Sequence, residues 1–328
     1  MTQSQSAGER WDKVRSQIEA LKKAIGTVIV GQDAVVELLL TSLLCKGHCL
    51  IIGVPGLAKT LLVTTLGRTL GLVSRRIQFT PDLMPMDITG GDILQEEGGG
   101  RRRFEFAPGP IFANLILADE INRTPPKTQA ALLEAMQEKQ VTVSGKSMKL
   151  SEPFIVFATQ NPIEHEGTYP LPEAQLDRFF FSLTMDYPSM DQERDIVLRT
   201  TGRHVAETPK VLEADEVLAL QEMILDVPVP DHVLEAILRT VNATRPNSPL
   251  AGDYVKRYVA WGAGPRASQT MTSAAKALAM LRGQSAASLE EVRAVMKPVL
   301  RHRVIPNYNA TGDGVTVDQI IEKLESSL

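Results

Sequence analysis

The segment Gly53-Val54-Pro55-Gly56-Leu57-Ala58-Lys59-Thr60 constrains the fold more than any other part of this chain. An apolar run from His48 to Ile52 precedes it like a buried strand, and Leu61 to Leu70 follows it with helical spacing. A strand, a glycine-containing loop and a helix form the context of a P-loop, which binds phosphate through backbone N–H groups and a lysine. We therefore predict that this loop binds a nucleotide. Lys59 would reach the β- and γ-phosphates, and Thr60 would ligate Mg²⁺.

Ala58 stands where a P-loop normally has glycine, directly before the lysine. A methyl group is tolerated there only if the backbone is helical. Because Ala58 lies at the start of the expected helix, we predict a helical conformation for it. A plain strand-to-helix turn is the alternative interpretation, and the Lys-Thr pair after Pro-Gly disfavours it.

The composition limits the class of protein. A length of 328 residues predicts about two domains. The formal net charge of −4 disfavours general affinity for nucleic acid. The two cysteines, Cys45 and Cys49, form no disulfide framework, and no long apolar span or leader is present, so we expect a cytoplasmic protein without membrane insertion. Residues 1–10 are polar and expected to be disordered. Cys45, His48 and Cys49 are too few for a structural zinc site, which needs about four ligands.

Polar side chains end two further apolar runs. The run from Asn114 stops at Asp119 and Glu120, and the run from Phe154 stops at Thr159-Gln160-Asn161. Parallel strands of an open α/β sheet bind ligands at their carboxyl ends, so these groups are expected to face the phosphates. Asp119 would serve Mg²⁺, Glu120 would serve a water molecule, and Asn161 would either orient that water or cap a turn before Pro162.

Other segments are expected to surround this site. The apolar turn Ile29-Val30-Gly31, between two predicted helices, is a candidate wall for a purine ring. Residues 87–106 contain a glycine cluster and Arg101-Arg102-Arg103, which predicts a glycine-tipped hairpin with a basic arm. The sequence leaves open whether that arm binds a partner or is simply solvated. A second hairpin is predicted around Ser144-Gly145.

After Pro188 only helices are expected. Ser189, Ser288 and Thr316 each precede a Gln or Glu by three residues, which is the pattern of a capping box. Arg266 follows Gly-Pro at a helix start, where a cation opposes the helix dipole, so we expect it to have an anionic partner.

The motifs and their order resemble the AAA+ ATPases, and specifically the MoxR family, over nearly the whole chain. Alanine before the P-loop lysine is similar to the MoxR form of Walker A. The further matching segments are Ala118 to Arg123 (Walker B), Ala158 to Pro162 (sensor 1), Leu171 to Phe179 (the arginine-finger segment) and Gly264 to Ser268 (sensor 2).

This resemblance implies an α/β P-loop core at 11–188 and a C-terminal α-helical lid domain at 189–328. The core would have a five-stranded parallel sheet of order 5-1-4-3-2. Residues 87–106 would be the helix-2 insert, and about 140–150 the pre-sensor-1 hairpin. Both would line the pore of a homo-oligomer, a hexamer.

The resemblance also implies ATP hydrolysis with Mg²⁺ at a subunit interface. Arg178 would be the arginine finger, with Arg123 as a second candidate. Arg266 would contact the γ-phosphate and couple hydrolysis to lid movement. We assign nucleotide binding to Ile29, Val30, Gly31, Gly53, Val54, Pro55, Gly56, Leu57, Ala58, Lys59, Thr60, Leu61 and Asp119, and the metal to Thr60 and Asp119.

Family members are associated with chaperone-like maturation of partner enzymes or metal-cofactor insertion, often with a von Willebrand A domain protein. Two alternatives stay open. In one, the protein is a nucleotide-gated assembly switch. In the other, it is a DNA-remodelling motor that uses the arm Arg101-Arg102-Arg103, which the net negative charge disfavours.

Overall fold

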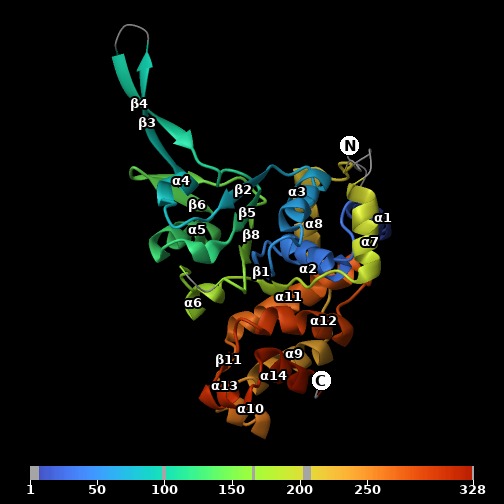
Figure 1. The fold of residues 1–328 in the computed structure, drawn as a ribbon. Helices are drawn as coiled ribbons and strands as arrows, with labels where there is room; N and C mark the ends of the chain where they lie inside the picture. The colour runs from blue at the N-terminus through green and yellow to red at the C-terminus, as the bar shows by residue number, and fades with distance from the viewer. Residues whose placement is uncertain (1–6, 98–100, 165–166, 202–207, 327–328) are drawn as a thin grey trace.

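The computed structural model describes residues 7–97, 101–164, 167–201 and 208–326. An α/β part and a helical part lie one on the other, and a hairpin extends away from the α/β part (Figure 1). Helix α1 begins at Ala7, so residues 7–10, which we expected to be disordered, are helical, and residues 1–6 lie outside the described residues. No helix in these described ranges is long and apolar enough to cross a bilayer.

Five parallel strands form the central sheet, and the predicted order is confirmed. Their spatial order is β2-β5-β8-β1-β9, which is 5-1-4-3-2 when the five are numbered along the chain. The strands are β1 (Cys49–Ile52), β2 (Ser74–Gln78), β5 (Leu115–Asp119), β8 (Ile155–Gln160) and β9 (Phe181–Thr184). The three central strands, β5, β8 and β1, are mostly apolar, as expected of parallel strands that are covered on both faces, whereas the edge strand β2 carries exposed arginines.

Helices make up most of the remaining chain. Those of the α/β part are α1 (Ala7–Gly26), α2 (Asp33–Leu44), α3 (Lys59–Thr69), α4 (Pro85–Thr89), the 3₁₀ helix η1 (Ile121–Arg123), α5 (Pro126–Glu138) and α6 (Glu173–Leu176). They are followed by α7 (Met190–Thr200), α8 (Ala214–Met223), η2 (Ile224–Asp226), α9 (Asp231–Ala243), α10 (Asp253–Tyr258), α11 (Pro265–Leu281), α12 (Leu289–Leu300), α13 (Tyr308–Asp313) and α14 (Val317–Glu325). The capping boxes predicted at Ser189, Ser288 and Thr316 are all present.

Both predicted hairpins are formed. Strands β3 (Gly90–Glu97) and β4 (Arg101–Pro108) pair antiparallel, and the intervening glycines 98–100 lie outside the described residues. Strands β6 (Gln140–Val143) and β7 (Lys146–Lys149) are joined by two residues with positive φ, as a tight hairpin turn requires.

The helical part contains one feature that the sequence did not predict. We expected only helices after Pro188, but β10 (Val259–Trp261) and β11 (Ile305–Pro306) pair antiparallel. The expectation was wrong because strands of three and two residues, one containing proline, carry no periodicity and form only through the tertiary fold.

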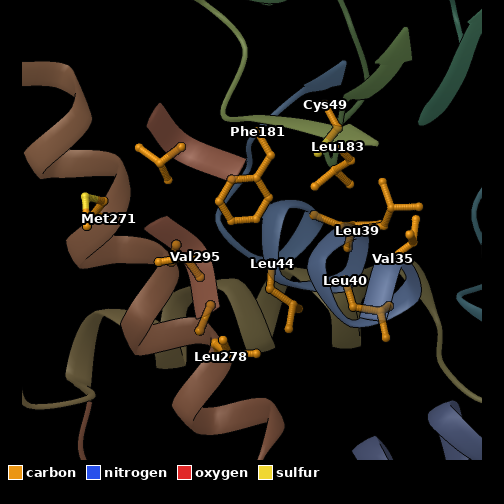
Figure 2. Close-up of a cluster of buried hydrophobic side chains, with 14 of the residues drawn as sticks. Val35, Leu39, Leu40, Leu44, Cys49, Phe181, Leu183, Met271, Leu278 and Val295 are labelled. Carbon is orange, nitrogen blue, oxygen red and sulfur yellow. The ribbon is translucent and has the colours of Figure 1, made fainter. Parts of the chain in front are cut away.

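One buried apolar cluster runs from the sheet into the helical part. Figure 2 shows Leu39, Leu40 and Leu44 of α2 beside side chains of β9, α11 and α12. Burying a leucine or valine side chain stabilises by about 1.5–3 kcal/mol, so several of them hold these layers firmly together. Arg282, directly after α11, also pairs with Glu37 of α2 at 3.0 Å. The core is therefore continuous between the sheet and the helical part.

Cys45, His48 and Cys49 belong to this packed interior. Both thiols are free, and burial raises the pKa of Cys49 to about 12. The His48 ring is bonded on both sides, with Nε2 donating to the Met136 carbonyl at 3.1 Å and Nδ1 accepting the Val156 N–H at 2.9 Å. Burial lowers the pKa of His48 to about 4, so the ring is neutral at pH 7. No group of three or more metal-binding side chains occurs within the described residues.

Candidate nucleotide-binding site

The P-loop runs from the carboxyl end of β1 to the first turn of α3, where Lys59 is the first helical residue. The Lys59 ammonium folds back over the loop and donates to the carbonyl oxygen of Gly53. Burial lowers its pKa, and the carboxylates of Asp119 and Glu120 partly oppose that effect. The lysine is thus held between the loop and two carboxylates, at a helix N-terminus that favours anions.

Ala58 differs from the prediction. Its φ of 55° and ψ of 25° are left-handed, not helical, and it is the N-cap of α3. Gly56, two residues earlier, also has a positive φ, of 88°, so the loop enters α3 through two residues with positive φ. Alanine in that conformation costs about 1–2 kcal/mol, so Ala58 stores strain at the phosphate site.

Replacing Ala58 with glycine is expected to raise the free energy of unfolding by up to about 1.5 kcal/mol. The gain is the strain released, about 1–2 kcal/mol, less the extra entropy of glycine in the unfolded chain, about 0.5–1 kcal/mol. Urea denaturation of the two proteins without added nucleotide measures the difference. A less stable Ala58→Gly protein would contradict the left-handed assignment.

Asp119 and Glu120 meet this loop in one cleft, as predicted. The cleft is lined by Pro55, Gly56, Leu57, Ala58, Lys59, Thr60, Arg76, Asp119, Glu120 and Asn161. The Thr159 hydroxyl at the end of β8 donates to Asp119 Oδ1 at 2.6 Å and accepts the Glu120 N–H at 2.9 Å. One hydroxyl therefore fixes both acidic residues. Glu120 is itself left-handed, with a φ of 58°, which turns its side chain out of the strand direction.

Two residues of β2 complete the acidic end of the cleft and were missed from the sequence. Arg76 donates to Asp119 Oδ2 through Nε at 3.0 Å and Nη2 at 2.7 Å. Gln78 donates to Glu120 Oε2 at 3.0 Å, and Arg123 donates to the same oxygen at 3.0 Å. The sequence signal for these two residues is a cation, Arg76, and an amide, Gln78, in the strand that pairs with the strand ending at Asp119.

Asn161 lies in the cleft and also performs the structural role that we kept open. It is 6% exposed, and its Oδ1 accepts the Ile163 N–H at 3.1 Å, which caps the turn at Pro162. The carbonyl end of the side chain is therefore fixed by the turn, and the amide end is the group available to a ligand.

A second pocket adjoins the cleft across the loop. Gly56, Leu57 and Ala58 line both. The other residues around this pocket are mostly apolar: Val28, Ile29, Val30, Gln32, Leu61, Leu62, Met185, Pro188, Ile196, Arg199 and Thr200. Of the predicted purine wall, Ile29 and Val30 line this pocket, and Leu61, which we assigned to nucleotide binding, lines it too. Gly31 does not line the pocket, but a Cβ there would meet the Gln192 side chain of α7 at 2.6 Å.

Helix α7 forms the outer wall of this apolar pocket, and the sequence did not predict it. Ile196 and Thr200 lie one helical turn apart and both face the pocket. Arg199 donates to the carbonyls of Gly26 and Thr27 at 3.1 and 3.2 Å, which ties α7 to the end of α1. The expected domain division assigns α7 to the lid, so the sequence does not predict that Ile196 and Thr200 contact a nucleotide base.

The oxygen groups of the cleft fit a magnesium ion. Thr60 is an exposed residue that provides a hydroxyl, and Asp119 provides the carboxylate of a buried residue. Mg²⁺ is usually held by one or two carboxylates together with substrate phosphates, and not by a cage of protein ligands. That matches a site with few acidic groups beside a phosphate-binding loop.

The predicted arginines are distributed differently. Among the described residues lining the cleft, neither Arg178 nor Arg266 occurs. Arg178 is exposed, and its Nη1 donates to the Leu133 carbonyl at 3.4 Å. Arg266 has the predicted anionic partner, because it pairs with Asp177 at 2.9 Å. The buried Arg303 pairs with the other Asp177 oxygen at 2.8 Å, so two arginines from the helical part hold the residue before Arg178.

Comparison with known proteins agrees with this geometry. The family model described as "ATPase family associated with various cellular activities (AAA)" matches residues 48–181, and "AAA lid domain" matches 253–324. The chain is 45% identical over 312 residues to Chaperone MoxR1 of Mycobacterium tuberculosis, covering 94% of this chain and 82% of the relative. It is 32% identical to Protein MoxR of Paracoccus denitrificans, covering 86% of each. A crystal structure from Cytophaga hutchinsonii, named as a candidate ATPase, has a TM-score of 0.90 at 39% identity and covers 98% of this chain and 97% of that one.

Proposed function

Because the chain belongs to the MoxR family of AAA+ ATPases, we propose that it binds ATP with Mg²⁺ in this site and hydrolyses it to ADP and phosphate. The observation that carries the proposal is the shared wall of two pockets. An apolar pocket of suitable character for a purine and an acidic, lysine-containing cleft meet at Gly56, Leu57 and Ala58. A nucleotide needs both environments on either side of one phosphate-binding loop.

The residues of this chain divide the chemistry between them. Lys59 and the helix N-terminus bind the phosphates. Thr60 and Asp119 would hold Mg²⁺, which neutralises charge on the phosphates when bound. Glu120 polarises the attacking water, and the amide end of Asn161 orients it.

Transition-state charge needs a further cation, which we propose comes from a neighbouring subunit. Arg178 is exposed and lies outside the cleft of its own chain, which suits a residue that acts in another subunit's site. Arg266 is joined to the same segment through Asp177, so we propose that it accompanies Arg178. Arg123 is a weaker candidate because it pairs with Glu120 of its own chain. The working assembly would be a homo-hexamer, with hairpins β3–β4 and β6–β7 toward its pore.

Hydrolysis would serve to remodel or mature a partner protein. The relative from Mycobacterium tuberculosis is named a chaperone, which supports a protein client. We extend this proposal in two ways. A von Willebrand A domain protein would link the ATPase to its client, and the result would be insertion of a metal cofactor into that client.

Capture of the client tests the role of the site. In the presence of ATP, Glu120→Gln protein should retain its client proteins, because it binds ATP but does not hydrolyse it and so does not release them. Mass spectrometry identifies the retained clients. Lys59→Ala/Glu120→Gln protein, which lacks phosphate binding, is the matched control and should lose them. The captured partner should then stimulate hydrolysis by the unmodified protein. Identical capture by both variants, with no stimulation, would contradict an ATP-driven remodeller.

A further inference from the structure

Arg76 occupies one oxygen of Asp119, the carboxylate that would hold a metal ion. Its side chain crosses from β2 to the end of β5, and two of its nitrogens donate to the same atom, Asp119 Oδ2, at 3.0 and 2.7 Å. The other oxygen, Oδ1, already accepts the Thr159 hydroxyl at 2.6 Å. Both oxygens of this carboxylate therefore have partners within the chain.

The ion pair between Arg76 and Asp119 can break at little cost in stability. Asp119 has a side chain 13% exposed, whereas the Arg76 side chain is 49% exposed and lines the phosphate cleft. A half-exposed ion pair contributes little net stability, because solvent screens it and its long side chain is costly to order. The guanidinium can therefore leave Asp119 toward solvent or toward phosphate oxygens, whose geometry suits a planar fork of donors.

Opening this pair also affects the second carboxylate. The Arg76 guanidinium contacts the carbonyl oxygen of the Gln78 side chain, and the amide nitrogen of Gln78 donates to Glu120 Oε2 at 3.0 Å. Asp119, Arg76, Gln78 and Glu120 thus form one continuous chain of contacts across the end of the sheet. Movement of the arginine removes a constraint on Gln78, and through it on Glu120.

We propose that Arg76 is an internal competitor of Mg²⁺ for Asp119, so that the metal binds only as the arginine leaves that carboxylate. The proposal rests on the proposed ATP site. Phosphate oxygens give the displaced guanidinium a new partner, which makes Mg²⁺ and nucleotide bind together and disfavours metal binding alone. Arg76 is in this sense a positioning residue that acts through Asp119.

Substitution of Arg76 with glutamine tests the competition. Glutamine at position 76 keeps a polar side chain beside Gln78 but removes the positive charge that pairs with Asp119. We expect the Mg²⁺ concentration that gives half of the metal-dependent increase in mant-ADP affinity to fall about fivefold, the size typical of a half-exposed ion pair. Arg76→Lys keeps a cation and should return the Mg²⁺ requirement close to that of the unmodified protein.

Arg75→Gln is the matched control, because Arg75 is the preceding, exposed residue of β2 and the change in net charge is the same. Its Mg²⁺ requirement should not move. Unchanged or increased Mg²⁺ demand in Arg76→Gln, with mant-ADP still bound, would overturn the competition. Failure of the unmodified protein to bind mant-ADP at any Mg²⁺ concentration would instead count against the proposed ATP site.

Discussion

Glu120→Gln protein is expected to release phosphate from ATP about 10²–10⁴ times more slowly than the unmodified protein, because its general base is lost. Glutamine keeps an oxygen that can accept the hydrogen bonds of Gln78 and Arg123, which are both 3.0 Å from Glu120 Oε2. The left-handed backbone at position 120 strains glutamine and glutamate equally. The fold and the phosphate loop should therefore be unchanged.

Two measurements separate binding from turnover in this variant. Fluorescent nucleotide titration should give an affinity within a few-fold of the unmodified protein, and steady-state phosphate release should be near background. Normal phosphate release by Glu120→Gln protein would exclude the water-polarising role of Glu120.

Arg178→Ala protein is expected to lose about 10³–10⁵ in hydrolysis rate, the range over which a finger arginine stabilises transition-state charge. The variant should remain folded, because Arg178 is exposed and its side chain donates a long, 3.4 Å hydrogen bond to a main-chain carbonyl. Nucleotide affinity should also be retained, since the residue lies outside the cleft of its own chain.

Arg239→Ala is a suitable control for this loss. Arg239 is an exposed arginine of α9 that pairs with Glu235 one turn away, a surface pair worth about 0.3–0.5 kcal/mol. Its removal should leave the hydrolysis rate unchanged. Equal rates for Arg178→Ala and the unmodified protein would remove Arg178 from the mechanism.

Much of the fold could be predicted because several local signals agree. The run ending at Asp119 is apolar at every position, so it had to be a buried strand, and acid at its end had to meet the P-loop at the carboxyl edge of the sheet. The capping boxes at Ser189, Ser288 and Thr316 were predicted correctly because they depend on side chains only three residues apart.

The missed features depend on residues that are distant in sequence. Arg76 reaches Asp119 because β2 and β5 are neighbours. The expected strand order places these two strands side by side, but it does not tell which side chain of β2 contacts the carboxylate. Helix α7 lines the apolar pocket beside the P-loop because Arg199 anchors the helix to the end of α1. The prediction for Ala58 follows from the helix after it, whereas its left-handed backbone belongs to the loop, in which Gly56 also has a positive φ.

The central claim is that each ATP site is completed by an arginine from a neighbouring subunit. Mixing Arg178→Ala subunits, which keep an intact phosphate site, with Lys59→Ala subunits, which keep the finger, tests it most directly. We predict that steady-state phosphate release in the mixture rises well above that of either variant alone, under conditions in which mixed oligomers are shown to form. Mixed oligomers that release phosphate no faster than the separate variants would contradict a shared site.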